Sequence, residues 1–192
     1  MIHANLKNAT RGFHTAMETK LSVLLSNGLS MQQYADVQKK FYGFYQPIEL
    51  QLASIGGWAD PEFDIQSRLK LPLLASDLGS LCVDPQEIEK LPLCGSVPCL
   101  ETISKALGCL YVLEGSTLGG RIITAHLKKR LPVDEIRGCT FFNSYGANVG
   151  RMWSAFLGVL NRHSEKHGDD DVIVESACQT FASLDRWFSN AA

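Results

Sequence analysis

The chain has 192 residues, of which 45% are hydrophobic and 20% are charged, and its formal net charge is −2. This length and composition are those of a globular domain with a substantial core, and we expect that single domain to span residues 1–192. The small net charge offers no general attraction to nucleic acid or to a membrane surface. No apolar run reaches the roughly 18 residues that span a bilayer, and the N-terminus lacks the pattern of a secretory signal, so we expect a cytoplasmic protein.

Apolar residues recur at helical spacing along the chain, and nothing in the pattern requires a sheet. The first helix is expected at about residues 3–26. Ser30 and Gln33 have the spacing of a capping box that starts a second helix, and Pro47 is expected to kink it. The second and later helices are predicted at about residues 30–55, 66–80, 85–90, 99–130, 146–167 and 170–189. With no repeat and no linker between them, the sequence predicts an all-α fold.

The six cysteines include no Cys-x-x-Cys pair, and Cys94 and Cys99 are too isolated from histidines to suggest a zinc site. We therefore expect reduced thiols, most of them small core residues.

Three glycines interrupt the helical pattern of residues 110–121, which read LYVLEGSTLGGR. Each interior glycine costs about 1 kcal/mol of helix stability relative to alanine. Gly115 and Gly119 are four residues apart, so they lie on one helix face that has no side chains. Such a face can accept a broad ligand against the backbone, or it can allow close packing of another helix.

A second motif lies near the N-terminus, where residues 6–18 read LKNATRGFHTAME on an amphipathic helix. His14 can bind a metal through one ring nitrogen, while Glu18, one turn later, fixes the tautomer of the ring. Lys7 and Arg11 lie on the same side and suit a flat ligand with carboxylates at its edge. The alternatives are a structural histidine and an ordinary solvated helix face.

A histidine on one helix and a bare glycine face on another can enclose a planar macrocycle. Residues 6–18 resemble the proximal helix of the haem oxygenases, and residues 115–120 resemble their distal helix. The segments 41–49 and 145–153 resemble two further helices of the same family, in the family's order. The form of the distal motif is similar to that of bacterial members, in particular the enzymes that serve bacterial phytochromes.

The resemblance implies that haem lies between the two helices of a helical bundle, with His14 as its metal ligand and Glu18 beside it. Gly115, Ser116 and Gly119 would form the catalytic distal face. Mammalian members carry an aspartate where this chain has Ser116, so the catalytic water network would depend on other groups. The further residues expected to contact haem are Lys7, Arg11, Tyr111, Gly120 and Arg151.

The choice between Lys7 with Arg11 and Arg151 as partners of the haem propionates stays open, and with it the biliverdin isomer. The resemblance implies that haem is both cofactor and substrate, and that O2 and an external electron donor, a reductase or a ferredoxin, convert it to biliverdin, CO and ferrous iron. A phytochrome is a candidate acceptor of the bilin.

Two other functions are compatible with the motifs. The first is a protein that stores, senses or delivers haem without degrading it, which the missing aspartate favours. The second is a thiamine-degrading relative, which needs a nucleophilic cysteine and paired carboxylates. Cys109 lies on the glycine-bearing helix but has no such pair.

Overall fold

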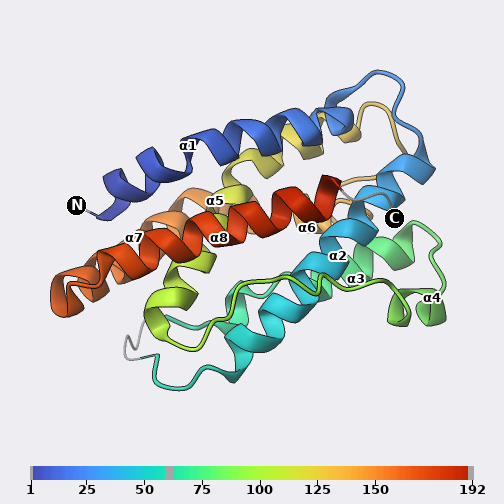
Figure 1. Cartoon of the computed structure of the whole chain (residues 1–192). Helices are drawn as coiled ribbons and strands as arrows, with labels where there is room; N and C mark the ends of the chain where they lie inside the picture. The colour runs from blue at the N-terminus through green and yellow to red at the C-terminus, as the bar shows by residue number, and fades with distance from the viewer. Residues whose placement is uncertain (1, 59–62, 190–192) are drawn as a thin grey trace.

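The computed structural model describes residues 2–58 and 63–189, and within these residues it is helical and contains no β-strand (Figure 1). The all-α expectation is confirmed. The elements in chain order are α1 (Ile2–Leu21), η1 (Ser22–Leu25), α2 (Met31–Ser54), η2 (Gln66–Arg68), α3 (Leu71–Ser80), α4 (Pro85–Glu89), α5 (Ile103–Leu127), α6 (Thr140–Asn143), η3 (Gly146–Asn148), α7 (Val149–His167) and α8 (Asp170–Ser189). No helix of the described ranges is both long enough and apolar enough to cross a membrane.

Side-chain caps place the helix starts where the sequence predicted them. Ser30 and Gln33 form the capping box of α2, with the Gln33 backbone N–H donating to Ser30 Oγ at 3.2 Å and the Ser30 N–H donating to Gln33 Oε1 at 2.9 Å. Asp84 caps α4 by accepting from the Gln86 N–H at 2.8 Å. Helix α2 continues past Pro47 to Ser54.

Several boundaries differ from the predicted ones. The first helix ends at Leu21 and continues as the short 3-10 segment η1, and α5 begins only after its cap Thr102. The short helix α6 was not predicted. Its first backbone N–H groups donate to Asp77 of α3, a residue far away in the sequence, so no local signal marks it.

Helix α8 packs against both α1 and α5, while α5 also contacts α6 and α7 (Figure 1). The crossing of α5 and α8 is close because Gly108 has no side chain: a Cβ there would lie 2.2 Å from the backbone oxygen of Ile173. Further along α8, Phe13 of α1 stacks on Phe181 with ring centroids 6.2 Å apart. Helix α8 therefore holds α1 and α5 in place relative to each other.

Helices α1 and α5 run in the same direction. Near their N-terminal halves, Tyr111 of α5 is hydrogen-bonded to Thr10 of α1. Beyond their C-terminal ends, Arg130 Nη2 donates to Asn27 Oδ1 at 2.6 Å. At about 1.5 Å per residue, the part of α5 from Tyr111 to its end at Leu127 is roughly 24 Å long, which is longer than a macrocycle is wide.

Candidate functional site

The outer face of α5 exposes large apolar side chains beside a bare glycine. Leu118 is 45% exposed and Ile122 is 69% exposed, and they lie four residues apart on one face of the helix. Between them, a Cβ built on Gly119 would meet no atom within 4 Å. Contiguous exposed apolar side chains are a feature of ligand-binding surfaces.

A hollow of about 670 Å³ lies on this face, which is the size of a small-molecule site. We call it the α5 hollow. Its lining residues are Leu118, Arg121, Ile122, Ala125, His126, Lys129 and Val149. It therefore combines an apolar floor with cations at its edge, a combination that suits a flat apolar ligand bearing carboxylates.

The three glycines of the motif have three different surroundings. A Cβ on Gly115 would make ordinary contact with the Trp153 ring, at 3.7 Å, and Gly119 faces open space. Gly120 is buried, and a Cβ there would lie only 2.0 Å from the backbone oxygen of Phe142. The close approach of α6 is by itself a sufficient reason for a glycine at this position, and the expected contact of Gly120 with the ligand stays a prediction.

On α1, the predicted residues form one exposed stripe. His14 Nδ1 lies 3.5 Å from Glu18 Oε2, and the His14 side chain is 61% exposed. Arg11 and Lys7 lie one and two turns before it, both exposed, and Arg11 also donates to Asn8 Oδ1 at 3.1 Å. The imidazole is therefore free to meet a ligand from outside the protein core.

The Thr10–Tyr111 contact shows how the exposed stripe of α1 that contains His14 lies relative to the glycine face of α5. Residues four apart in a helix share a face, so one turn beyond this contact lie His14 on α1 and Gly115 on α5. Tyr111 itself is held between rings, with its centroid 6.1 Å from that of His3 and 5.6 Å from that of Trp153. It therefore joins the two helices at one end of the candidate site.

Arg151 lies on α7 and is exposed. Two residues later, Trp153 contacts Gly115, and two residues of helix correspond to a rotation of about 200°. Arg151 thus points away from the side of α7 that meets the glycine face. The structure groups Lys7 and Arg11 with His14 and leaves Arg151 apart from them.

Ser116 lies at the border between the exposed face and the core. Its hydroxyl donates to the Leu113 backbone oxygen at 2.7 Å and lies 3.5 Å from the hydroxyl of Tyr45. Burial raises the pKa of Tyr45 far above its usual value, so this phenol keeps its proton at neutral pH. The pair offers two neutral hydroxyls that can hold a water molecule next to Gly115.

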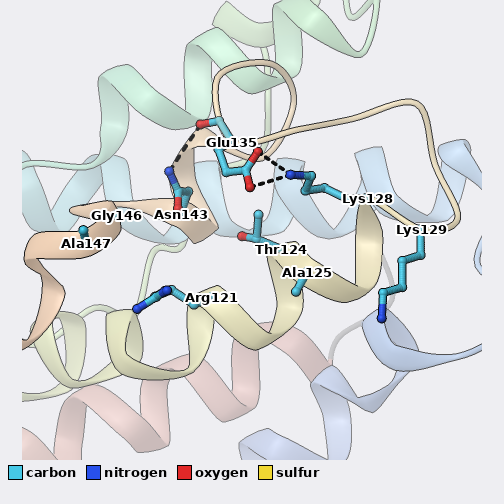
Figure 2. A pocket seen from close by; sticks show the side chains of 9 residues that line it. All are labelled: Arg121, Thr124, Ala125, Lys128, Lys129, Glu135, Asn143, Gly146 and Ala147. Atoms are coloured by element: carbon cyan, nitrogen blue, oxygen red, sulfur yellow. Dashed lines mark hydrogen bonds and ion pairs between the residues drawn. The ribbon is translucent and has the colours of Figure 1, made fainter.

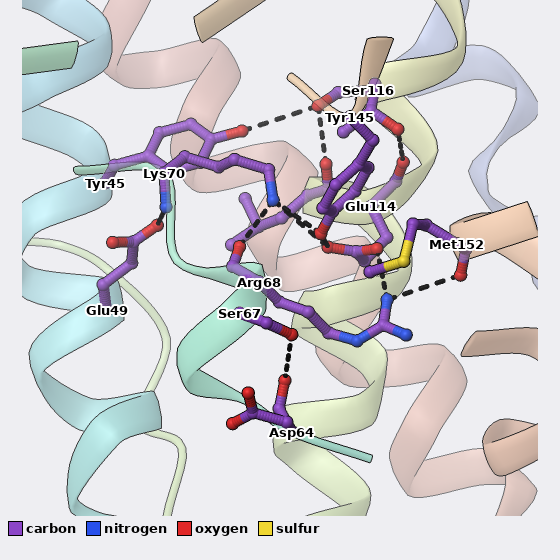
Figure 3. Close-up of polar contacts among 12 residues, drawn as sticks. Tyr45, Glu49, Asp64, Ser67, Arg68, Lys70, Glu114, Ser116, Tyr145 and Met152 are labelled. Carbon is purple, nitrogen blue, oxygen red and sulfur yellow. Dashed lines mark hydrogen bonds and ion pairs between the residues drawn. The ribbon is translucent and has the colours of Figure 1, made fainter. Parts of the chain in front are cut away.

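Sequence reasoning missed a buried cluster of charged residues around Glu114, the residue before Gly115 on α5 (Figure 3). Glu114 accepts from Arg68 Nη1 at 2.6 Å and from the Tyr145 hydroxyl at 2.7 Å, and Lys70 Nζ lies 3.7 Å from the same carboxylate. The only local signal was an acidic residue at a core-facing position of an apolar helix. Its partners come from η2, the start of α3 and the turn before α7, which no spacing could reveal.

A second hollow of about 650 Å³ lies on another side of the same half of α5 (Figure 2). At its wall, Lys128 Nζ pairs with Glu135 Oε1 at 2.6 Å, and Asn143 lies opposite. Gly115, Gly119 and His14 line neither hollow, and the two hollows share Arg121, Ala125 and Lys129. The α5 hollow is the better candidate for an apolar ligand because the exposed side chains of Leu118 and Ile122 line it.

No group of three or more histidine, cysteine or carboxylate side chains suited to a metal ion occurs among the residues that the structure describes. A metal bound at His14 must then bring most of its ligands with it. Iron held in a porphyrin meets this requirement, since it needs a single axial protein ligand.

Comparison with known proteins agrees with this chemistry. A family model described as heme oxygenase matches residues 2–190. Among solved structures, the NO- and CO-bound heme oxygenase from Neisseria meningitidis has a similar fold, with a TM-score of 0.78 and 23% sequence identity over 100% of this chain and 94% of that chain. A comparison with curated protein sequences gave no match. Because the family model covers nearly the whole chain, the chain belongs to the haem oxygenase family, whose members are enzymes that degrade haem to biliverdin.

Proposed function

We propose that this chain binds haem between the His14 stripe of α1 and the glycine face of α5, and that it cleaves the ring with O2 and electrons from an external donor. The observation that carries the proposal is the open space at Gly119 between the exposed Leu118 and Ile122. An apolar ring placed there would remove both side chains from water. The products are biliverdin, CO and ferrous iron.

His14 is the proposed axial ligand, and Glu18 holds the imidazole by accepting from its other ring nitrogen, which lies 3.5 Å away. When bound, haem supplies both the redox centre and the carbon that is oxidised. Gly115 and Gly119 let the backbone of α5 approach the ring and exclude bulk water. Ser116, with Tyr45 behind it, holds a water molecule and its proton on the distal side.

Lys7 and Arg11 are the proposed partners of the haem propionates, because they share a helix face with His14. Arg151 becomes the weaker candidate, since Trp153 and not Arg151 faces Gly115. Arg121 and Lys129 at the edge of the α5 hollow are further cations within the site. The angular position of the ring, and so the biliverdin isomer, depends on which of these cations bind the propionates.

The proposed electron donor is a reductase or ferredoxin, and the proposed compartment is the cytoplasm. The exposed cations Lys128, Lys129 and Arg130 lie at the end of α5, next to the haem site, and favour an acidic donor. A phytochrome apoprotein is the proposed acceptor of the bilin. This last assignment rests on the similarity of residues 110–121 to the enzymes that serve bacterial phytochromes.

The test is a turnover assay on the purified protein with one equivalent of hemin, in air, with ascorbate or a ferredoxin and its reductase. We expect the Soret band to disappear, a biliverdin band to grow, and CO to be captured by added ferrous myoglobin. A stable haem spectrum under both electron donors would instead indicate a protein that binds haem without degrading it.

A further inference from the structure

The cluster around Glu114 is buried almost completely. The Glu114 side chain is 1% exposed, and those of Arg68 and Lys70 are 4% exposed. Lys70 Nζ donates to the Tyr145 hydroxyl and to the Arg68 backbone oxygen, both at 2.6 Å, and Tyr145 donates to Glu114. These bonds join Arg68, Lys70 and Tyr145 to the Glu114 carboxylate and to one another, as Figure 3 shows.

This cluster is not explained by stability alone. Burial of an ion pair costs several kcal/mol per ion in desolvation, and well-packed apolar residues of similar volume are often as stabilising. The desolvation cost is visible at Lys70, because burial lowers its pKa to about 8 in spite of the nearby Glu114. Such a cluster adds little net stability, but its hydrogen bonds require a strict geometry. It is therefore suited to fixing one orientation of the helix that carries it.

Helix α5 needs such an orientation. Gly115 and Gly119 contribute no side chain that could fix the rotation of the helix about its own axis, and they make it easy to bend. The rotation must therefore be set by other residues of α5. Glu114 is bonded to residues of three separate segments, and Gly120 lies against Phe142 one to two turns later.

We propose that Glu114 is a positioning residue for the distal face: its buried carboxylate, held by Arg68, Tyr145 and Lys70, fixes the rotation of α5 so that Gly115 and Gly119 face the ligand. The same rotation places the Ser116 hydroxyl toward Tyr45. The rotation of α5 is a property of the ligand-free protein. The consequence of this rotation for haem rests on the proposed function.

The test of the rotation is amide hydrogen exchange of the ligand-free protein. For Glu114→Gln, which keeps the shape of the side chain and removes its charge, we expect at least tenfold faster exchange at residues 115–120 and unchanged exchange in α8. Tyr145→Phe should give a smaller increase in the same segment. The matched control is Tyr34→Phe, which also removes one buried phenol, bonded to the Gly138 backbone oxygen, and should leave residues 115–120 unchanged.

A double variant keeps the test decisive if Glu114→Gln does not fold. Glu114→Met combined with Arg68→Met replaces the ion pair with apolar side chains and is expected to fold. Faster exchange at residues 115–120 in this variant supports the proposal. Unchanged exchange there, in the double variant or in folded Glu114→Gln, would overturn it.

The consequence for the ligand is measured on the haem complex. For Glu114→Gln we expect hemin affinity within about twofold of the unaltered protein, but a product that changes from one predominant biliverdin isomer to a mixture. A merely structural role would lower the yield without altering the isomer ratio. If exchange increases but the unaltered protein never degrades haem, then the proposed function fails while the role of Glu114 in positioning α5 stands.

Discussion

Replacing Gly119 with leucine tests whether this glycine serves ligand binding or helix packing. Leucine is a better helix former than glycine by about 0.8 kcal/mol, and nothing lies within 4 Å of the position its Cβ would take. In a chain of this size, 1 kcal/mol corresponds to about 2–4 °C in Tm. We therefore expect Gly119→Leu to melt about 2–3 °C higher than the unaltered protein in the absence of haem.

The same variant should lose activity, because the new side chain would occupy the space where haem must lie against the backbone. We expect single-turnover biliverdin yield to fall at least tenfold, which corresponds to about 1.4 kcal/mol in the barrier. Circular dichroism, Tm and turnover are measured on one sample.

Gly120→Ala is the matched control, one residue away. Its Cβ would lie 2.0 Å from the Phe142 backbone oxygen, so the helices must separate, at a cost of about 2 kcal/mol or more. We expect a Tm lower by about 4–8 °C. A Gly119→Leu protein that is destabilised but turns over haem normally would refute the reasoning, because Gly119 would then serve helix packing.

Three further outcomes are expected. The double variant Lys7→Ala/Arg11→Ala should weaken hemin binding by about 1–3 kcal/mol and alter the ratio of biliverdin isomers on HPLC, whereas unchanged affinity and ratio would place the propionates elsewhere. Burial lowers the pKa of Lys70 to about 8 in the folded protein, from about 10.4 when unfolded, so the unfolded state binds more protons at this residue between these values and the contribution of Lys70 to stability rises with pH there. Burial raises the pKa of Cys109 and Cys139, which contribute with the opposite sign, so the test is the difference between two proteins: in urea unfolding from about pH 8 to pH 10, the change of stability with pH should be more positive in the unaltered protein than in Lys70→Met, and equal slopes would contradict the assignment. Ser144 has φ +46° and ψ −111°, a conformation that glycine adopts freely, so Ser144→Gly should raise Tm by about 2–4 °C in a thermal melt, and a lower Tm would show that the serine is not strained.

The sequence was sufficient for features whose cause is local. The caps at Ser30 and Asp84 act within three residues of themselves, so the starts of α2 and α4 could be predicted. The family motifs are local too, since the residues of each lie within a single helix. Helix α6 could not be predicted, because Asp77, which accepts its first backbone N–H groups, is on α3.

The candidate site also combines features that have a local cause with features that depend on residues far away in the sequence. Sequence placed Gly115, Gly119 and Gly120 in one motif, but it could not tell that Gly119 faces open space while Gly120 lies against Phe142. That difference depends on the rotation of α5 and on a helix that comes later in the chain. Glu114 was missed for the same reason, since its partner Arg68 belongs to a different element.

The central claim is that His14 is the protein ligand of the haem iron, and its most direct test is the optical spectrum and turnover of the His14→Ala hemin complex with and without added imidazole. We expect this variant to bind hemin through the apolar face of α5, to lose its native axial bond and biliverdin formation, and to recover part of both when imidazole fills the vacated space. His167→Ala, which removes another exposed histidine, should behave as the unaltered protein. A His14→Ala protein with the native spectrum and normal turnover without imidazole would contradict the account.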